Sequence, residues 1–482
     1  MDYNVVLLCL DSVRKDRFDR AASRLVRRAN ITFDSCRALS SWSAPSHASM
    51  LTGSLPSEHG VHSHSQRYDS VRKAETFLSS LGGYTTLGVS ANPFACSFFG
   101  FDRLFDHFQD VQPGLPFSEG MHANQEKWSS PETGHALYRA LLGRALEHEY
   151  PARSVVNALS SLLEEHVPTI PLPGRRDDGG REVIRQSKRL ISRTDEPFFL
   201  FTNFMEAHQP FYRRRYHNAT FQPRVDADES GVETVSDVPI SWEFGAAEKT
   251  RTNVTGGLTD PVEQARYRAI YSADIASLAS LLEGFLNWLQ SRTERPTAIV
   301  ITADHGENLG YESENNLIDH MASLSEGLLH VPLVVILPDA DESREVEVMT
   351  SHSELGRLML GLARGSGVPD MAVERPRAEI LGGGEAQNQL DDEHDRYEFM
   401  TRMQRCVYAD DRKFVWDTAG NAWSSDFHTE PTSFERQLSE TFEVKEFDER
   451  CFDRGIRDVK DEAATGELTQ EVSARLRDLG YA

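Results

Sequence analysis

Six residues of the chain combine side-chain types that suit metal binding and nucleophilic chemistry. Carboxylates and imidazoles can hold a divalent cation, and a hydroxyl beside a cation can become a nucleophile. Each of the six follows an apolar run typical of a strand or opens a segment typical of a helix. In chain order they are Asp11, Ser43, His47, His208, Asp304 and His305.

Asp304 and His305 offer two potential metal ligands from a single turn after the apolar run 297–302. Gly306, which follows them, allows a backbone turn that a side chain would block. Asp with His suits Zn or Mn, whereas oxygen ligands alone suit Ca or Mg. His320 follows 15 residues after His305, before the next apolar run.

Ser43 lies just before a helix opened by Pro45. The N-terminus of such a helix favours a nearby anion. His47 is about one helical turn further on and can reach the same side. His208 follows the apolar run 197–204 and could act as an acid, a base or an anion donor. The structural alternative is that Asp11 and Ser43 cap helices and that the histidines are satisfied core groups.

Strands that alternate with helices must position these residues. Short apolar runs predict strands at 5–10, 31–36, 85–90, 197–204, 297–302 and 331–337. Helical spacing or composition predicts helices at 16–28, 71–81, 262–292 and 351–364. This alternation predicts an α/β fold with a mostly parallel central sheet flanked by helices. Ligands of such sheets bind beyond the carboxyl ends of the strands, where the clusters fall.

The 482 residues divide into a large and a small part. We predict a catalytic α/β domain over 1–345, with inserts at about 110–190 and 223–260. The first insert is expected to hold helices, and the second reads as a surface loop or lid. The polar, acidic composition of residues 346–482 predicts a smaller C-terminal α+β subdomain.

The charge balance is strongly acidic: 51 Lys and Arg stand against 75 Asp and Glu, a net charge of -24. Such a surface repels phosphate backbones and anionic lipids, so nucleic acid and membrane surfaces are not expected partners.

The basic residues comprise only 8 Lys beside 43 Arg. An acidic, Lys-poor surface suits high salt, which indicates a halophilic source; an ordinary acidic enzyme from a GC-rich genome is the alternative. We expect the melting temperature to rise through a KCl series, and no stabilisation above ordinary salt would contradict the halophilic interpretation.

Targeting signals and paired cysteines are not expected. No run of 18 apolar residues occurs, which argues against a membrane span, and the first residues do not resemble a signal peptide. The cysteine number is odd and no C-x-x-C occurs, so reduced thiols in a cytoplasm are expected. The cysteines are Cys9, Cys36, Cys96, Cys406 and Cys451.

Taken together, the clusters resemble the sulfatase family of the alkaline phosphatase superfamily. Their order and spacing carry the resemblance, which covers nearly the whole chain. The similar stretches are 4–12, 43–53, 56–61, 100–102, 208–211, 304–307, 326–332 and 475–481.

The resemblance implies an alkaline-phosphatase-like core and a hydrolase with one divalent ion at its nucleophile. Asp11, Asp304 and His305 would be metal ligands, and the oxygen of Ser43 would complete the site. Ser43 would then attack sulfur or phosphorus in line with the leaving oxygen.

Three histidines would assist. His208 would protonate the leaving group, His320 would hold a substrate oxygen, and His47 would support Ser43 or the anion.

Three positions depart from the family pattern. Sulfatases usually carry Cys, sometimes Ser, at position 43 and convert it to formylglycine, a conversion that favours Arg four residues later. Here that residue is His47, so an unmodified Ser43 is expected and formylglycine is not. Ser12 replaces a second carboxylate. His305 replaces an Asn, which favours Mn or Zn over Ca or Mg.

The expected substrate is a sulfate or phosphate ester of a small molecule or a glycan. A formylglycine hydrate can eliminate sulfate, whereas a plain serine ester must be cleaved by water, which favours phosphate. The usual activity of the family favours sulfate, so both esters stay open. Two alternatives remain: a phosphotransferase that moves a phospho-head-group onto a glycan, and a non-catalytic sulfatase-like binding protein. The sequence predicts no oligomeric state.

Overall fold

The computed structural model describes most of the chain. The described residues are 3–111, 120–121, 134–166, 178–194, 197–214, 217, 230–245, 252–253, 255–292, 295–320, 322–338, 342–382, 390, 393–429, 434–438 and 442–463. The family-like ending at 475–481 and parts of both predicted inserts lie outside these residues.

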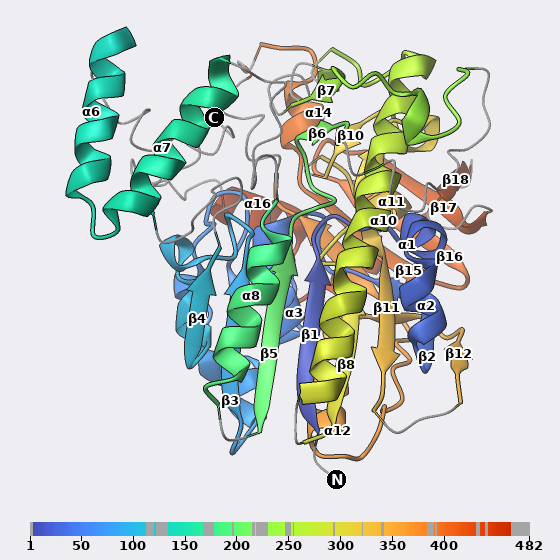
Figure 1. The fold of residues 1–482 in the computed structure, drawn as a ribbon. Coiled ribbons are helices and arrows are strands. Elements are labelled where there is room, and N and C mark those ends of the chain that lie inside the picture. Colours follow the sequence, from blue (N-terminus) through green and yellow to red (C-terminus); the bar gives the residue numbers. More distant parts are fainter. Residues whose placement is uncertain are drawn as a thin grey trace.

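A large mixed sheet forms the centre of the described part of the chain (Figure 1). β11 runs antiparallel to both of its neighbours, and the other neighbouring strands are parallel. This confirms the predicted α/β fold with a mostly parallel sheet. Its strands, in spatial order, are β12 (Arg344–Val346), β2 (Ile31–Arg37), β11 (His330–Ile336), β8 (Thr297–Thr302), β1 (Asn4–Leu10), β5 (Phe198–Phe204), β3 (Thr85–Ser90) and β4 (His107–Asp110), and β13 (Thr350–Ser351) also pairs with β2.

Helices cover both faces of this sheet. Figure 1 shows α8 and α10 in front of it and α3 and α12 behind it. α6 and α7 stand apart from the sheet and pack against each other within the first predicted insert. The helices are α1 (Lys15–Ala21), α2 (Ser23–Arg28), α3 (Ser43–Thr52), α4 (Pro56–His59), α6 (Gly134–Glu147), α7 (Pro151–His166), α8 (Gly180–Ile191), α10 (Pro261–Arg292), α11 (Glu326–Leu329), α12 (Leu355–Ala363), α14 (Tyr397–Thr401), α15 (Val444–Cys451) and α16 (Ile456–Ala463).

A second, antiparallel sheet lies in the C-terminal part. Its strands are β14 (Arg377–Ile380), β15 (Gln404–Ala409), β16 (Arg412–Asp417), β17 (Ala422–Thr429) and β18 (Phe434–Leu438). Two small ribbons pair β9 (Asn308–Leu309) with β10 (Ile318–Asp319) and β6 (Phe211–Tyr212) with β7 (Glu243–Phe244). β13 and α12 lie beyond residue 345 but pack with the large sheet, so the second sheet begins later than the predicted boundary.

The predicted helix at 71–81 is wrong. The segment forms short 3-10 turns at Lys73–Glu75 and Phe77–Ser80, after a similar turn at Tyr68–Ser70. Thr76 interrupts them with an extended backbone, and its hydroxyl donates a hydrogen bond to the carbonyl of Lys73 at 2.7 Å. Such a side-chain bond to the local backbone competes with helix continuation.

The long helix α10 bears on the expectation that no segment spans a membrane. Its residues Pro261–Ser291 are long and apolar enough to cross a membrane by length and composition, although no unbroken apolar run occurs. However, 72% of that apolar window is buried inside the protein. The helix packs against α1 and α8, so packing in the core accounts for its composition.

The order of the strands brings the chemically important segments to one edge. β8, β1, β5 and β3 are adjacent and parallel, and every residue of β8, β1 and β5 is buried. Their carboxyl ends therefore meet, and the residues that follow them share one site.

Buried Glu326 at the start of α11 joins the two sheets. Its carboxylate lies 2.9 Å from Arg37 at the end of β2 and 3.1 Å from Lys413 on β16, and it accepts a hydrogen bond from Tyr408 on β15. Burial by itself would raise the pKa of Glu326, but Arg37 and Lys413 outweigh it and lower that pKa to about 2. Glu326 is therefore ionised in the folded protein at neutral pH.

Glu326→Gln is expected to destabilise the protein at pH 7 by about 3 kcal/mol, because one pKa unit is worth about 1.4 kcal/mol and Arg37 and Lys413 each lose one charged contact. The folded pKa lies below the ordinary value of 4.5, so this stabilisation is complete above about pH 4.5 and is lost as the pH falls toward 2. Urea unfolding at pH 7 and pH 3, with exposed Glu374→Gln as control, measures it. An equal loss at both pH values would show that packing, not charge, is responsible.

Candidate active site

Asp11 directly follows β1 and is fully buried. Its Oδ2 accepts hydrogen bonds from the side-chain amides of Asn92 at 2.5 Å and Asn203 at 3.1 Å, and its Oδ1 accepts one from the Ser12 hydroxyl at 3.1 Å. The next helix, α1, begins at Lys15 without a side-chain cap. The structure therefore gives no support to the interpretation of Asp11 as a helix cap.

Asp304 and His305 follow β8, next to Asp11. The backbone amides of Ser12 and His305 donate to Asp304 Oδ1 at 3.2 and 3.0 Å. Gly306 lies so close to the carbonyl of Gly327 that any Cβ at position 306 would collide with it. Glycine is therefore required where the chain turns away from the site, as the sequence suggested.

Ser43 is the first residue of α3. Its Oγ lies 3.3 Å from Nε2 of His305, and the same nitrogen lies 3.3 Å from Oδ2 of Asp304. Trp42 occupies the cap position of α3, and Ser43 makes no capping bond. The hydroxyl that the sequence singled out thus lies beside the carboxylate and the imidazole from β8.

His47 lies beneath Ser43 and is fully buried. Its Nδ1–H donates to the carbonyl of Ser43 at 2.7 Å, and its Nε2 accepts from the amide of Asn203 at 3.0 Å. Burial lowers the pKa of this imidazole. These contacts position the start of α3; a direct catalytic role for His47 stays a prediction.

His208 and His320 continue the site away from His305. The rings of His305 and His320 are 4.6 Å apart, and those of His320 and His208 are 5.2 Å apart. Nδ1 of His208 binds the carbonyl of Gln209 at 2.7 Å, and Nδ1 of His320 binds Glu307 at 2.8 Å. Because both Nδ1 atoms are engaged, Nε2 is the atom that each ring can offer to a substrate.

The donor set fits a divalent cation. Oδ2 of Asp304 is buried and has no hydrogen-bond partner, although the other three oxygens of the two carboxylates each accept at least one bond. Asp11, Asp304 and His305 place one ligand atom each within 4.8 Å of one another. These three residues could therefore hold the ion that sulfatases generally use.

The pKa shifts of Asp304 and His305 also suit the binding of a cation. Burial and the repulsion of Asp11 raise the pKa of Asp304 well above its usual range, so a positive charge beside Asp304 would favour its ionised form. Burial and the neighbouring His320 lower the pKa of His305 well below its ordinary value, which keeps the imidazole neutral and able to bind a metal.

Three polar residues of the site were not assigned a role from the sequence. Asn92 follows β3 and Asn203 belongs to β5, and both bind Asp11. Glu307 orients His320 and also accepts a hydrogen bond from Tyr267 at 3.0 Å. The available signal was a lone amide in the apolar run 198–204, because a buried polar residue needs a partner.

Fold and site together define a member of the alkaline phosphatase-like superfamily: a central sheet flanked by helices, with a carboxylate pair and a hydroxyl at its carboxyl edge. The model of the family named Sulfatase matches residues 3–366. The chain belongs to the sulfatase family.

Two named proteins are similar in sequence. "Uncharacterized sulfatase YidJ" of Escherichia coli (strain K12) is 23% identical over 275 residues, which are 55% of this chain and 50% of that protein. "Arylsulfatase K" of Gallus gallus is 34% identical over 113 residues, 23% of this chain and 20% of that protein. The chain therefore spans about half the length of the first relative and a fifth of the second.

Two solved structures share the fold. BT4656, in complex with its substrate D-Glucosamine-2-N, 6-O-disulfate, aligns with a TM-score of 0.57 at 14% identity over 99% of both chains. The phosphonate monoester hydrolase of Agrobacterium radiobacter aligns with a TM-score of 0.56 at 17% identity over 89% of this chain and 90% of that one. These likenesses confirm the predicted fold class.

Proposed function

We propose that the protein is a metal-dependent hydrolase that cleaves a sulfate or phosphate ester with unmodified Ser43 as nucleophile. The observation that carries the proposal is the position of Ser43 Oγ, 3.3 Å from His305 Nε2 and beside the buried Asp11 and Asp304 pair. Sulfatase family membership and the fold shared with a glucosamine disulfate-binding protein and a phosphonate monoester hydrolase support it.

The residues divide the chemistry between them. When bound, a divalent cation stabilises a deprotonated hydroxyl and the negative ester oxygens. Ser43 Oγ forms a bond to sulfur or phosphorus while the bond from that atom to the alcohol oxygen breaks. Protonated His208 donates from Nε2 to the leaving oxygen, and His320 holds a nonbridging oxygen. Water then cleaves the seryl ester and restores the hydroxyl.

The direct test compares p-nitrophenyl sulfate, p-nitrophenyl phosphate and bis-p-nitrophenyl phosphate with Ca, Mg, Mn and Zn, in molar KCl. We expect turnover that depends on the added ion, and highest with Mn or Zn because the donor set includes an imidazole. The preferred ester identifies the group transferred. No turnover with any ester and ion would contradict the proposal and favour the non-catalytic alternative.

Glu307→Gln is expected to lower kcat for the preferred ester by about 10- to 100-fold, because the carboxylate fixes the ring and tautomer of His320. The isosteric amide keeps the side-chain volume, so the melting temperature should change little. Turnover measured across pH, with exposed Glu347→Gln as control, separates orientation of His320 from a structural effect. An unchanged kcat and pH profile would rule out this positioning role.

A further inference from the structure

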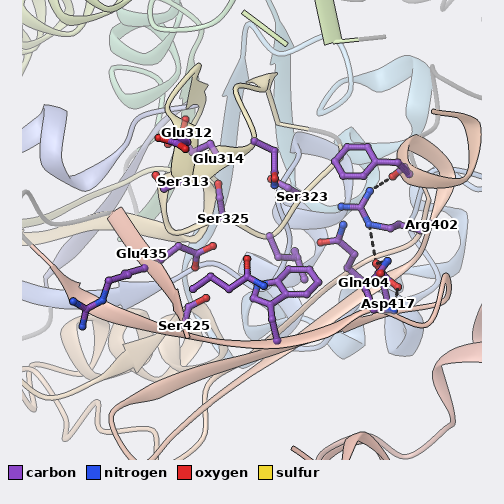
Figure 2. A pocket seen from close by; sticks show the side chains of 17 residues that line it. Glu312, Ser313, Glu314, Ser323, Ser325, Arg402, Gln404, Asp417, Ser425 and Glu435 are labelled. Atoms are coloured by element: carbon purple, nitrogen blue, oxygen red, sulfur yellow. Dashed lines mark hydrogen bonds and ion pairs between the residues drawn. The ribbon is translucent and has the colours of Figure 1, made fainter. Parts of the chain in front are cut away.

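A cavity of about 680 Å³ lies between the segment 312–325 and the C-terminal antiparallel sheet (Figure 2). Glu312, Glu314 and Ser325 line one side, and Ser425 and Glu435 of the sheet line the opposite side. The residues that the proposed reaction uses are not part of this lining.

The lining is mostly neutral and hydrogen-bonding. Hydroxyl and amide residues are its largest group, 8 of 17 beside 6 charged residues, and the half-buried indole of Trp423 on β17 adds a flat apolar surface. Sites for small polar ligands combine an aromatic surface with a few convergent polar groups in this way. The hydroxyl and amide residues include Ser313, Ser323, Ser325, Gln404, Asn421 and Gln437.

Five of the six charged residues in the cavity lining pair with an opposite charge, and Glu312 is the sixth. Arg402, for example, pairs with Asp417, and Figure 2 shows this contact at the cavity wall. A second sulfate or phosphate group would have to compete with these carboxylates, so the lining favours an uncharged ligand. The pairs are Glu314 with Arg14 at 2.5 Å, Arg402 with Asp417 at 3.1 Å, Glu435 with Lys413 at 2.9 Å and Arg436 with Asp426 at 3.1 Å.

One buried side-chain oxygen of the lining makes no hydrogen bond. The Oγ of Ser425 is buried and makes no hydrogen bond, and the residue is only 1% exposed. Ser425 lies two residues after Trp423 on β17, so both side chains project from the same face of the strand. A ligand hydroxyl that stacks near the indole would satisfy this oxygen.

The cavity is connected to the catalytic residues through one short segment. Asn308 follows Glu307, which orients His320. Its side chain binds Ser323 at 3.3 Å and Ser325 at 2.7 Å, and both serines line the cavity. Ser323 is three residues after His320, so their Cα atoms are at most about 11 Å apart. The cavity therefore lies within about one sugar ring's span or two of His320, close enough for the alcohol part of an ester to extend toward it.

We propose that this cavity binds an uncharged sugar ring, stacked on Trp423 and hydrogen-bonded by Ser425 and the neighbouring amides. The proposal rests on the proposed function in one respect: it makes the alcohol part of the ester a saccharide with an unsulfated ring beside the reacting one. Binding of the ring itself requires no turnover.

The test measures binding of four neutral disaccharides, cellobiose, chitobiose, lactose and maltose, to the full-length protein by saturation-transfer NMR and calorimetry. Sucrose octasulfate serves as the polyanionic comparison. Ser425→Ala and Ser424→Ala form a matched pair: both hydroxyls are buried and without a partner, the residues are adjacent, and only Ser425 lines the cavity. Trp423→Ala removes the stacking surface.

We expect at least one neutral disaccharide to bind, with affinity lowered at least tenfold by Trp423→Ala and about three- to tenfold by Ser425→Ala, and unchanged by Ser424→Ala. Failure of all four to bind, equal losses in the two serine variants, or Trp423-dependent binding of the octasulfate alone would overturn the proposal. Sugar binding without ester hydrolysis would refute the proposed function and leave the sugar site standing; hydrolysis without sugar binding would do the reverse.

Discussion

Ser43→Ala is expected to reduce turnover of the preferred p-nitrophenyl ester by ~1,000-fold or more, because it removes the only atom proposed to bond to sulfur or phosphorus. The substitution deletes one oxygen at the first position of α3, where Ser43 makes no capping bond. The fold and the carboxylate pair should therefore survive, and the melting temperature should stay close to that of the wild type.

Ser46→Ala is the matched control for this variant. Ser46 is also buried on α3, but its hydroxyl donates to the carbonyl of Ser40 at 3.0 Å. Its loss should cost about 1 kcal/mol of stability and leave kcat nearly unchanged. If Ser43→Ala kept more than a tenth of wild-type turnover, direct attack by water would replace the seryl-ester mechanism. A mass increase on Ser43 in rapidly quenched wild-type protein would support the covalent route independently.

Asp304→Asn is expected to abolish both turnover and tight binding of a divalent ion. Asp304 contributes the one carboxylate oxygen of the pair that accepts no hydrogen bond, Oδ2. A ligand that binds only the folded state at 100 times its Kd stabilises it by about 2.7 kcal/mol. Added Mn or Zn should therefore raise the melting temperature of the wild type and not that of the variant.

Without a bound ion, wild type should no longer be more stable than Asp304→Asn. Asp304 and Asp11 are two buried carboxyl groups that face each other, and burial together with Asp11 raises the pKa of Asp304. Replacing one of them by an amide relieves this conflict, so Asp304→Asn without metal should be at least as stable as the wild type. Metal content by mass spectrometry and melting with a chelator measure both effects, with exposed Asp370→Asn as control. A variant that retained one equivalent of ion would exclude Asp304 as a ligand.

Much of the fold could be predicted from apolar runs. The strands β1, β3, β5 and β8 were predicted to within one residue at each end, because fully buried parallel strands appear as short apolar segments. The antiparallel direction of β11 could not be predicted, since its apolar run is the same in either direction. The predicted helix at 71–81 is broken by extended backbone at Val71, Arg72 and Thr76, and the hydrogen bond of the Thr76 hydroxyl is a local feature that composition does not reveal.

The candidate site was predictable only in part. Asp11, Ser43, Asp304 and His305 attract attention by residue type, and the sheet brings them together. Asn92 and Asn203 belong to the site because they donate hydrogen bonds to Asp11. Those bonds form because β5 lies beside β1 and β3 lies beside β5. Strand order is a property of the whole fold, so no local pattern could have linked these amides to the carboxylate.

The bridge that Glu326 makes between the two sheets bears on how the protein could be altered by recombination. The proposed chemistry lies on the large sheet, whereas Trp423 and Ser425 belong to the C-terminal sheet. Chimaeras that replace residues 377–438 by the segment of a relative could thus change specificity without rebuilding the nucleophile, provided that the incoming segment has a Tyr and a Lys at the positions of Tyr408 and Lys413. A graft without the Lys413 contact would leave buried Glu326 with Arg37 but without its second cation, so the incoming residue at that position sets how well the two sheets join.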